Sequence, residues 1–208
     1  MPQPARTSLI AAATLFGLSA AAGLANGLAG SVPKPAHGAA PWPAPADPLR
    51  LTRAAGLTPE RHETLIHHVH SHLDVFVNAR AARVPAGIGI NIRDPGVKVF
   101  TAPDGSKAYG GIRLCKSVCI SPLHTHDDTG IIHTESASSV PNRLGQFFTE
   151  WGVALSRTCV GGYCNLKGPH VYVGGKAFTG DPRGILLTDR KEIAIVIGTP
   201  PKKIPADF

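Results

Sequence analysis

Alternating hydrophobic and polar positions recur along the chain from residue 64 onward and predict β-strands. In residues 64–77 the apolar side chains fall on one face, while histidines and an aspartate fall on the other. This period of two indicates a half-buried strand with a polar face that carries histidines. Other stretches are also expected to form strands: 83–90, 97–101, 109–114, 123–126, 131–136, 170–173, 184–187 and 193–197. Turn-forming residues at 103–106 and 127–130 predict two hairpins.

One stretch, residues 143–155, has a helical period instead. Its apolar residues repeat at spacings of three and four, namely Leu144, Phe147, Phe148, Trp151 and Leu155. Such a stripe is typical of a helix that packs on the core, with Asn142 available as its cap. The 23 glycines and 19 prolines argue against a helical bundle, because both residues disrupt helix interiors.

The strand pattern also repeats within the chain. Residues 75–81 followed by 85–88 are similar to residues 171–177 followed by 182–185, and a predicted hairpin comes after each copy. The predicted fold class is therefore mainly β, a sandwich or barrel built from two related β units, with one amphipathic helix between them.

The N-terminal part has a different composition from the rest. No charged residue lies between Arg6 and Lys34, and residues 9–25 are apolar. Residues 1–30 are therefore expected to be a signal peptide, or alternatively an N-terminal membrane anchor. Residues 31–50 contain six prolines and are expected to form a linker. A single His-rich β domain would then span residues 51–208. The predicted location is outside the cytoplasm: periplasmic, secreted or anchored on the outer side of the membrane.

Four cysteines, Cys115, Cys119, Cys159 and Cys164, are an even number in a chain predicted to be exported. This favours two disulfides, and the local pairs Cys115–Cys119 and Cys159–Cys164 are slightly favoured among the three possible connectivities. The spacing of the first pair also matches the copper-carrying cysteines of Sco-type copper chaperones. Those proteins need strands that alternate with helices, and this chain lacks that pattern, so a structural disulfide is the favoured interpretation.

The histidines are concentrated in two short segments. Seven of the ten lie at 67–72 and 124–133. If residues 127–130 form the loop of a hairpin, His124 pairs with His133 and His126 with Ile131, so that His124, His126 and His133 share one sheet face. A divalent transition metal would satisfy three neighbouring imidazoles, and Cu or Zn suits an all-imidazole site best. The alternative is a solvated polar face without a metal.

The earlier segment offers further ligands for the same ion. His70 and His72 share a strand face, so either of them would supply a fourth ligand if their strand lies beside the hairpin. Glu135 lies on the same face as His133 and is expected to be a ligand, a hydrogen-bond acceptor for a ring N–H, or a base. Asp127 and Asp128 are interpreted as turn residues.

At these residues the chain resembles a group of exported bacterial proteins that carries no established activity. The shared motifs are HxHxHLxVFVN at 68–78, LHTHDDTGIIHTES at 123–136, LGQFFTEWG at 144–152 and EIAIVIGTPP at 192–201. The resemblance covers about residues 64–205 and implies that these segments belong to one domain. The group has Asn-Gly or Asp-Gly where this chain has Asn78-Ala79. Cupins share an HxH motif with a third His and a Glu, but their Glu follows HxH within a few residues, whereas Glu135 lies nine residues after His126.

These observations predict an exported metal-binding protein that uses a histidine cluster to bind, store or deliver Cu or Zn. The alternative is a metal-dependent enzyme with a three-His site and Glu135 as acid or base, since motifs of the common hydrolases and nucleotide-binding proteins are absent from the sequence. The expected partners are the metal ion and a membrane-associated metal-handling protein. Nucleic acid is not expected as a partner: the formal charge is +7, but no helical stripe of Lys and Arg carries it.

Overall fold

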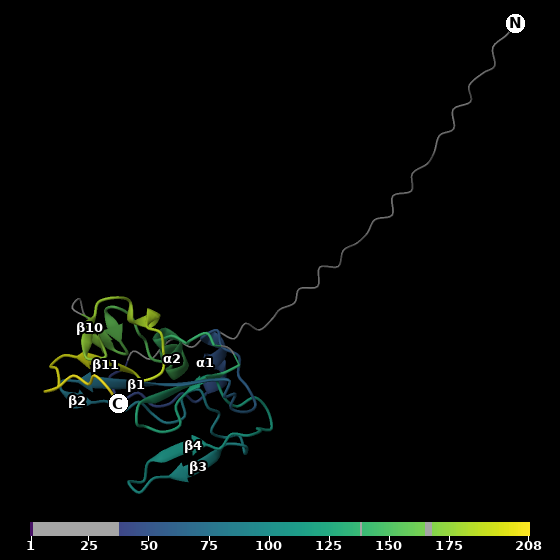
Figure 1. The fold of residues 1–208 in the computed structure, drawn as a ribbon, viewed down its shortest axis with the longest axis horizontal. Coiled ribbons are helices and arrows are strands. Elements are labelled where there is room, and N and C mark those ends of the chain that lie inside the picture. Colours follow the sequence, from purple (N-terminus) through teal and green to yellow (C-terminus); the bar gives the residue numbers. More distant parts are fainter. Residues whose placement is uncertain (2–37, 138, 165–167) are drawn as a thin grey trace. The chain divides into compact units, whose positions relative to one another are not determined.

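The computed structural model describes Met1 and residues 38–137, 139–164 and 168–208, and these residues form a mainly β structure (Figure 1). The predicted signal peptide or anchor at 1–30 lies outside the described residues apart from Met1, as does the first part of the predicted linker. In the described part of the chain, no helix has the length and apolar character needed to cross a membrane.

The principal sheet has seven strands. Six follow the order β10-β9-β11-β1-β6-β5, and β2 pairs with β1 beside them. The bounds are β1 His67–Val77, β2 Arg80–Ala81, β5 Leu123–His124, β6 Ile131–Ser136, β9 His170–Val173, β10 Lys176–Phe178 and β11 Lys191–Ile197. Neighbouring strands are antiparallel except for β1 and β11, which are parallel at the centre. Both stretches of the predicted repeat contain a hairpin, β1-β2 and β9-β10, and both hairpins belong to this one sheet.

One face of the sheet packs against the helix α2, Leu144–Trp151. Leu73 and Val75 of β1 are buried in the same core cluster as Phe147 and Trp151 of α2, and the buried residues of β1 alternate as the sequence predicts. The helix is shorter than expected, because Gly152 adopts a left-handed conformation that ends it. Arg143, and not Asn142, occupies the N-cap position.

The segment expected to be an extended linker contributes to the domain from residue 38 onward. Trp42 is buried, packs edge-on against Trp151 at 5.6 Å between ring centroids, and its carbonyl accepts a hydrogen bond from the Trp151 indole. The short helix α1, Pro48–Ala54, is capped by the Asp47 side chain and contacts α2. Sequence composition alone missed this role, because prolines dominate the segment.

Two of the expected strands are not strands. In residues 83–90, Gly87 and Gly89 have φ angles of 82° and 73°, which interrupt an extended backbone. Their segment instead makes turns whose peptide groups bond to residues near β5, as in the hydrogen bond from Gly87 N to Thr125 O. In residues 184–187, Gly184 ends a short 3₁₀ helix, Pro182–Gly184, that Asp181 caps, and residues 185–187 follow it outside the named strands.

Two smaller hairpins lie outside the principal sheet. The first is β3–β4, Lys98–Thr101 and Lys107–Gly110, and the second is β7–β8, Cys159–Val160 and Tyr163–Cys164. The chain contains both locally paired disulfides, Cys115–Cys119 and Cys159–Cys164. The first is buried in a second small core with Ile90, Ile112 and Ile120. Such disulfides are typical of an oxidising, extracellular type of environment.

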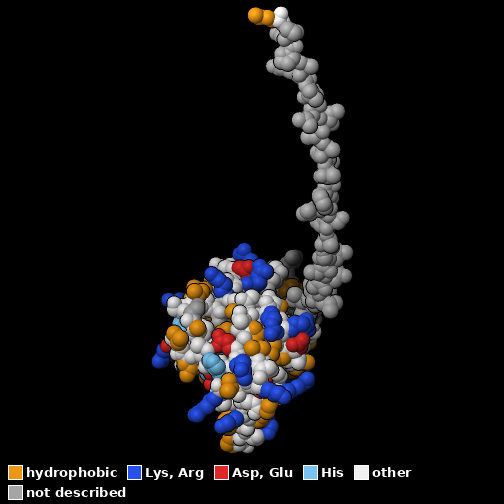
Figure 2. Space-filling view, turned by 90° about the vertical axis from the view of Figure 1, so that its right-hand side faces the viewer, with side chains coloured by type: hydrophobic (Ala, Val, Ile, Leu, Met, Phe, Trp, Pro, Cys, Tyr) orange, Lys and Arg blue, Asp and Glu red, His pale blue; other side chains and the backbone are white. Residues whose placement is uncertain are grey.

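The surface carries basic side chains without a single dominant patch on the face drawn in Figure 2, where Lys and Arg are spread among acidic and apolar side chains. The hairpin β3–β4 extends from the body of the domain in Figure 1.

Candidate metal centre

Strand β6 is the middle strand of the site. Its His133 pairs with His124 of β5 on one side and with His70 of β1 on the other, and its Glu135 pairs with His68 of β1. Side chains directly opposite one another in antiparallel strands project from the same face. The predicted pairing of His124 with His133 is therefore present, and β1 lies beside the hairpin as the fourth-ligand hypothesis requires.

His126 reaches the site by a different route from the one expected. β5 ends at His124, so His126 does not pair with Ile131. Its carbonyl instead accepts a hydrogen bond of 2.8 Å from the Tyr109 amide of β4, and its ring Nδ1 donates to the Tyr109 carbonyl. The His126 ring centroid nevertheless lies 4.7 Å from that of His124 and 4.4 Å from that of His133. A contact from outside the hairpin thus fixes this histidine.

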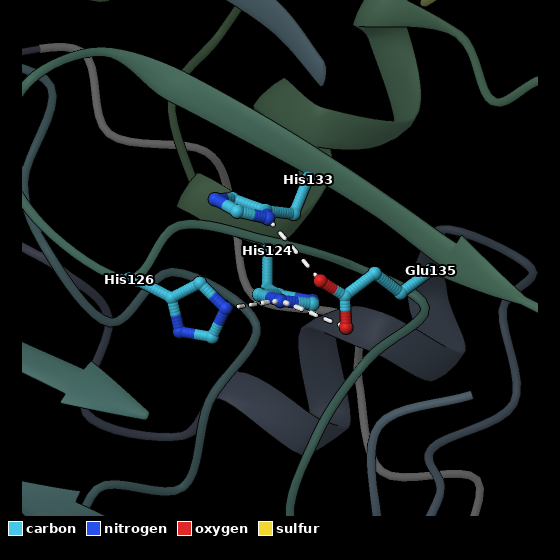
Figure 3. A group of neighbouring side chains, drawn as sticks. All are labelled: His124, His126, His133 and Glu135. Atoms are coloured by element: carbon cyan, nitrogen blue, oxygen red, sulfur yellow. Dashed lines mark hydrogen bonds and ion pairs between the residues drawn. The ribbon is translucent and has the colours of Figure 1, made fainter. Parts of the chain in front are cut away.

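Five imidazoles and one carboxylate make up what we call the histidine cluster, defined as His68, His70, His124, His126, His133 and Glu135. Figure 3 shows four of these residues, with Glu135 reaching toward His124 and His133 and with His126 pointing at His124. His124, His126, His133 and Glu135 place one ligand atom each within 4.8 Å of one another, as do His68, His70 and His133.

The protonation of two of these rings follows from their backbone partners. His124 Nδ1 lies 2.9 Å from the Ser121 carbonyl, and His126 Nδ1 faces the Tyr109 carbonyl. A carbonyl only accepts, so both Nδ1 atoms must carry the hydrogen, and in the neutral rings both Nε2 atoms have a free lone pair. These two Nε2 atoms are 3.2 Å apart. The backbone therefore holds two unprotonated ring nitrogens facing each other.

A proton between the two facing nitrogens would relieve their repulsion, but burial disfavours the charged form of either ring. Burial, with the neighbouring His126, lowers the pKa of His124 to about 3. Burial also lowers the pKa of His126, with a further contribution from His133, and it lowers the pKa of His70. These rings are consequently neutral at pH 7, which is the form that binds metal ions.

Tight packing holds His124 in this position. Its side chain is fully buried. Gly89, with φ of 73°, approaches so closely that an added Cβ would lie 2.4 Å from the Leu123 carbonyl oxygen and 3.1 Å from the His124 Cβ. Only glycine fits at this point, so the turn at residues 86–89 braces the strand that carries His124.

Glu135 is aimed into the cluster. Its Oε1 lies 3.2 Å from His133 Nδ1 and 3.2 Å from His68 Nε2, and its Oε2 lies 3.9 Å from His124 Nε2. Burial raises the pKa of Glu135, but the hydrogen bond from His133 and the nearby His124 outweigh burial and lower it to about 2. Oε2 is buried and has no hydrogen-bond partner among the described residues. Such an orphaned anionic oxygen is costly unless a cation meets it.

His68 belongs to the cluster although the sequence analysis did not select it as a ligand. Its Nε2 lies 3.0 Å from His70 Nε2. The signal that would have found it is the spacing of His68 and His70, which is the same as that of His124 and His126. Glu63 was also missed: its Oε1 lies 3.9 Å from His126 Nε2, and neither periodicity nor a motif marks it.

His72 lies outside the cluster, so that of the two alternatives for a further ligand, His70 and His72, only His70 is brought to it. Its Nδ1 lies 2.8 Å from Glu192 Oε2 and its Nε2 lies 2.8 Å from the Thr129 carbonyl oxygen. The hydrogen bond to Glu192 raises the pKa of His72 despite its partial burial. With an acceptor at each nitrogen, the protonated ring donates from both and in that form has no lone pair for a metal. The cause is the parallel neighbour β11, which the sequence analysis did not place next to His72.

Comparisons of the chain with protein-family models, with curated proteins and with solved structures found no match.

Proposed function

We propose that this chain is an exported metal-binding protein whose histidine cluster binds Cu or Zn for storage or delivery. The observation that carries the proposal is the contact between His124 Nε2 and His126 Nε2, 3.2 Å apart, with both Nδ1 atoms committed to carbonyl groups. Two lone pairs held face to face repel each other, and a bound cation turns this repulsion into two coordinate bonds.

The spacing suits a transition metal. Zn–N bonds are about 2.0–2.1 Å long, so two ligands of a tetrahedral ion lie about 3.3 Å apart. The backbone acceptors at Nδ1 also match the usual arrangement around metal-bound histidines, in which the other ring nitrogen donates to a carbonyl or a carboxylate. Imidazole suits both Zn and Cu, and the donor set does not select between them.

Binding is favoured over catalysis by the position of Glu135. Both of its oxygens face ring nitrogens of the cluster, which suits a ligand, whereas a general base must face the reacting water or substrate. Export is part of the proposal because two disulfides need an oxidising compartment. Delivery would further require a recipient, and a membrane-associated metal-handling protein stays a prediction.

One observation supports the enzyme as a second candidate. Glu63 faces His126 from outside the cluster, and its pKa is raised by burial and by the nearby Glu135. A carboxyl group of this kind beside an ion with an open coordination position would be able to hold a proton. A pocket of about 660 Å³ has Tyr109 and Asp128 in its wall, but no histidine of the cluster lines it.

The test is metal analysis of the exported protein, purified without an affinity tag that contains histidine. We expect bound Zn or Cu after purification, loss of the metal on dialysis against a chelator, and recovery on addition of the metal alone. His170 is exposed and lies outside the cluster, so His170→Ala is a matched control that should bind as the parent does. Protein that remains free of metal in both steps would contradict the proposal.

The role of Glu135 separates the two candidates. In a binding protein, Glu135→Gln should lower the affinity for the metal, because a neutral amide replaces an anionic ligand. In an enzyme with Glu135 as acid or base, the same variant should keep its metal and lose turnover of a substrate. Metal retention by Glu135→Gln would therefore count against Glu135 as a ligand.

A further inference from the structure

We propose that the histidine cluster is a two-metal centre, in which Glu135 bridges one divalent ion held by His124 and His126 and a second held by His68 and His70. This inference rests on the proposed metal-binding function and extends it, because it assigns a second ion to residues that the first does not need.

Two pairs of histidines with similar separations of their Nε2 atoms carry the inference. His124 and His126 approach from β5 and the residues just after it, and their Nε2 atoms are 3.2 Å apart. His68 and His70 approach from β1, and their Nε2 atoms are 3.0 Å apart. Both separations are close to the spacing of about 3.3 Å between two nitrogens on one tetrahedral ion. Each pair is thus built as half of a coordination sphere.

A single ion would leave one of these pairs unused. A tetrahedral ion takes four donors, and His124, His126, His133 and Glu135 already supply four. The second group consists of His68, His70 and His133, and the two groups share only His133. With the first site filled, the facing nitrogens of His68 and His70 would still lie 3.0 Å apart without a cation.

The strand register explains why the pairs flank a common centre. His133 on β6 stands opposite His124 on one side and His70 on the other. Glu135, two residues further along β6, stands opposite His68. The middle strand therefore presents its His133 and Glu135 to both pairs at once.

Glu135 presents one oxygen to each pair. Its Oε1 lies 3.2 Å from His68 Nε2, while its Oε2 lies 3.9 Å from His124 Nε2. Within the part of the chain that the structure describes, the buried Oε2 has no hydrogen-bond partner. A carboxylate that binds one ion through each oxygen suits two-metal sites, in which the ions lie about 3.5–4 Å apart. Its negative charge lies between the two cations and offsets their repulsion. Glu63, beside His126, adds a second negative charge at the edge of the cluster.

The experiment measures how many ions one chain binds. The exported protein, stripped with a chelator and free of any His tag, is titrated with Zn²⁺ alone by calorimetry, and its metal content is counted after dialysis. We expect two Zn²⁺ per chain in the parent protein and in His170→Ala. The double variant His68→Ala/His70→Ala should keep one. Glu135→Gln should weaken both binding steps. Circular dichroism of each stripped variant checks that it folds, and His68→Gln/His70→Gln replaces the alanine variant if that one does not.

The outcomes separate this inference from the proposed function. One Zn²⁺ per parent chain, retained in full by the His68/His70 double variant, overturns the two-metal centre and leaves the metal-binding function standing. One Zn²⁺ that disappears in the same variant also overturns it, since all the histidines would then serve a single ion. Absence of binding in the parent protein overturns both.

Discussion

Two groups of titratable side chains lie side by side on strand β1 and differ in their chemistry. His70 belongs to the histidine cluster, whereas His72, two residues further along the same strand face, forms an ion pair with Glu192 of β11. His70 has a ring nitrogen 3.0 Å from another histidine. Both ring nitrogens of His72, in contrast, lie 2.8 Å from oxygen acceptors.

The difference shows that the neighbours of a histidine, and not its motif, decide its role. Where acceptors face both nitrogens, the ring holds two hydrogens and a positive charge and is complete without a metal. Where another nitrogen faces an unprotonated ring nitrogen, as between His124 and His126, a bound cation satisfies both lone pairs. His72, Asp74 and Glu192 are close enough to form a metal-sized group, yet both ring nitrogens of His72 face oxygen acceptors, and a nitrogen that donates a hydrogen offers no lone pair to a metal.

The largest expected effect is the loss of metal affinity on removal of a cluster ligand. His124→Ala should weaken Zn²⁺ binding by about 100-fold or more, because losing an outer partner of a metal ligand already costs about 10–100-fold. His72→Gln should leave the affinity unchanged. Calorimetric titration of both variants measures the contrast, and an equal loss of affinity in the two would remove the distinction between the groups.

The second largest effect is expected on stability, because a bound metal ion raises the free energy of unfolding. At a free Zn²⁺ concentration 100 times the dissociation constant, the free energy of unfolding should rise by about 2.7 kcal/mol. The same increase is expected in His72→Gln, whereas His124→Ala should lose the share that comes from the ion at His124 and His126, as followed by urea unfolding with and without Zn²⁺. A stabilisation of His124→Ala as large as that of the parent protein would show that no ion is held by His124.

The His72 ion pair should contribute a smaller stabilisation that depends on pH. The hydrogen bond to Glu192 raises the pKa of His72 above its ordinary value of 6.5. The contribution is therefore fully present below pH 6.5 and is lost as the pH rises through the raised pKa. His72→Gln keeps a donor to Glu192 but loses the charge, so it should cost about 1 kcal/mol at acidic pH and less at alkaline pH. Urea unfolding of metal-free protein across this range checks the slope, and a cost that grows with pH would contradict the charged ring.

The smallest effect is expected at Asp74. It lies 3.8 Å from His72 Nδ1, and burial raises its pKa although His72 opposes this. Glu192 already accepts the hydrogen from that nitrogen at 2.8 Å. Asp74→Asn should therefore change the free energy of unfolding by about 0.5 kcal/mol or less. A loss larger than that of His72→Gln would show that Asp74 is the principal partner of His72.

Local patterns in the sequence predicted several parts of the site correctly. The alternation in residues 67–77 predicted which face of β1 carries histidines, and the turn residues at 127–130 predicted that His124 faces His133. Both results depend on neighbours along the chain, because strand faces alternate with a period of two. The two disulfides join cysteines four and five residues apart and are equally local.

Other parts depended on contacts between distant segments. The sequence did not reveal that Tyr109 orients His126, that Trp42 enters the core, or that residues 83–90 bend at glycines to brace His124. Each of these needs a partner more than fifteen residues away, and no periodicity encodes such a partner. The helix also ended earlier than its apolar stripe, because Gly152 takes a left-handed conformation.

The sequence by itself determined that this is a mainly β chain with histidines gathered on strand faces, since periodicity and composition are properties of neighbouring residues. Only the tertiary structure decided which histidines are able to bind a metal. Placing β6 between β5 and β1 brought His124, His133 and His70 into one row, and placing β11 on the other side of β1 gave His72 a carboxylate. The physical reason is that a ring nitrogen that faces an oxygen acceptor carries a hydrogen and has no free lone pair. The order of the strands decides which atom each nitrogen faces.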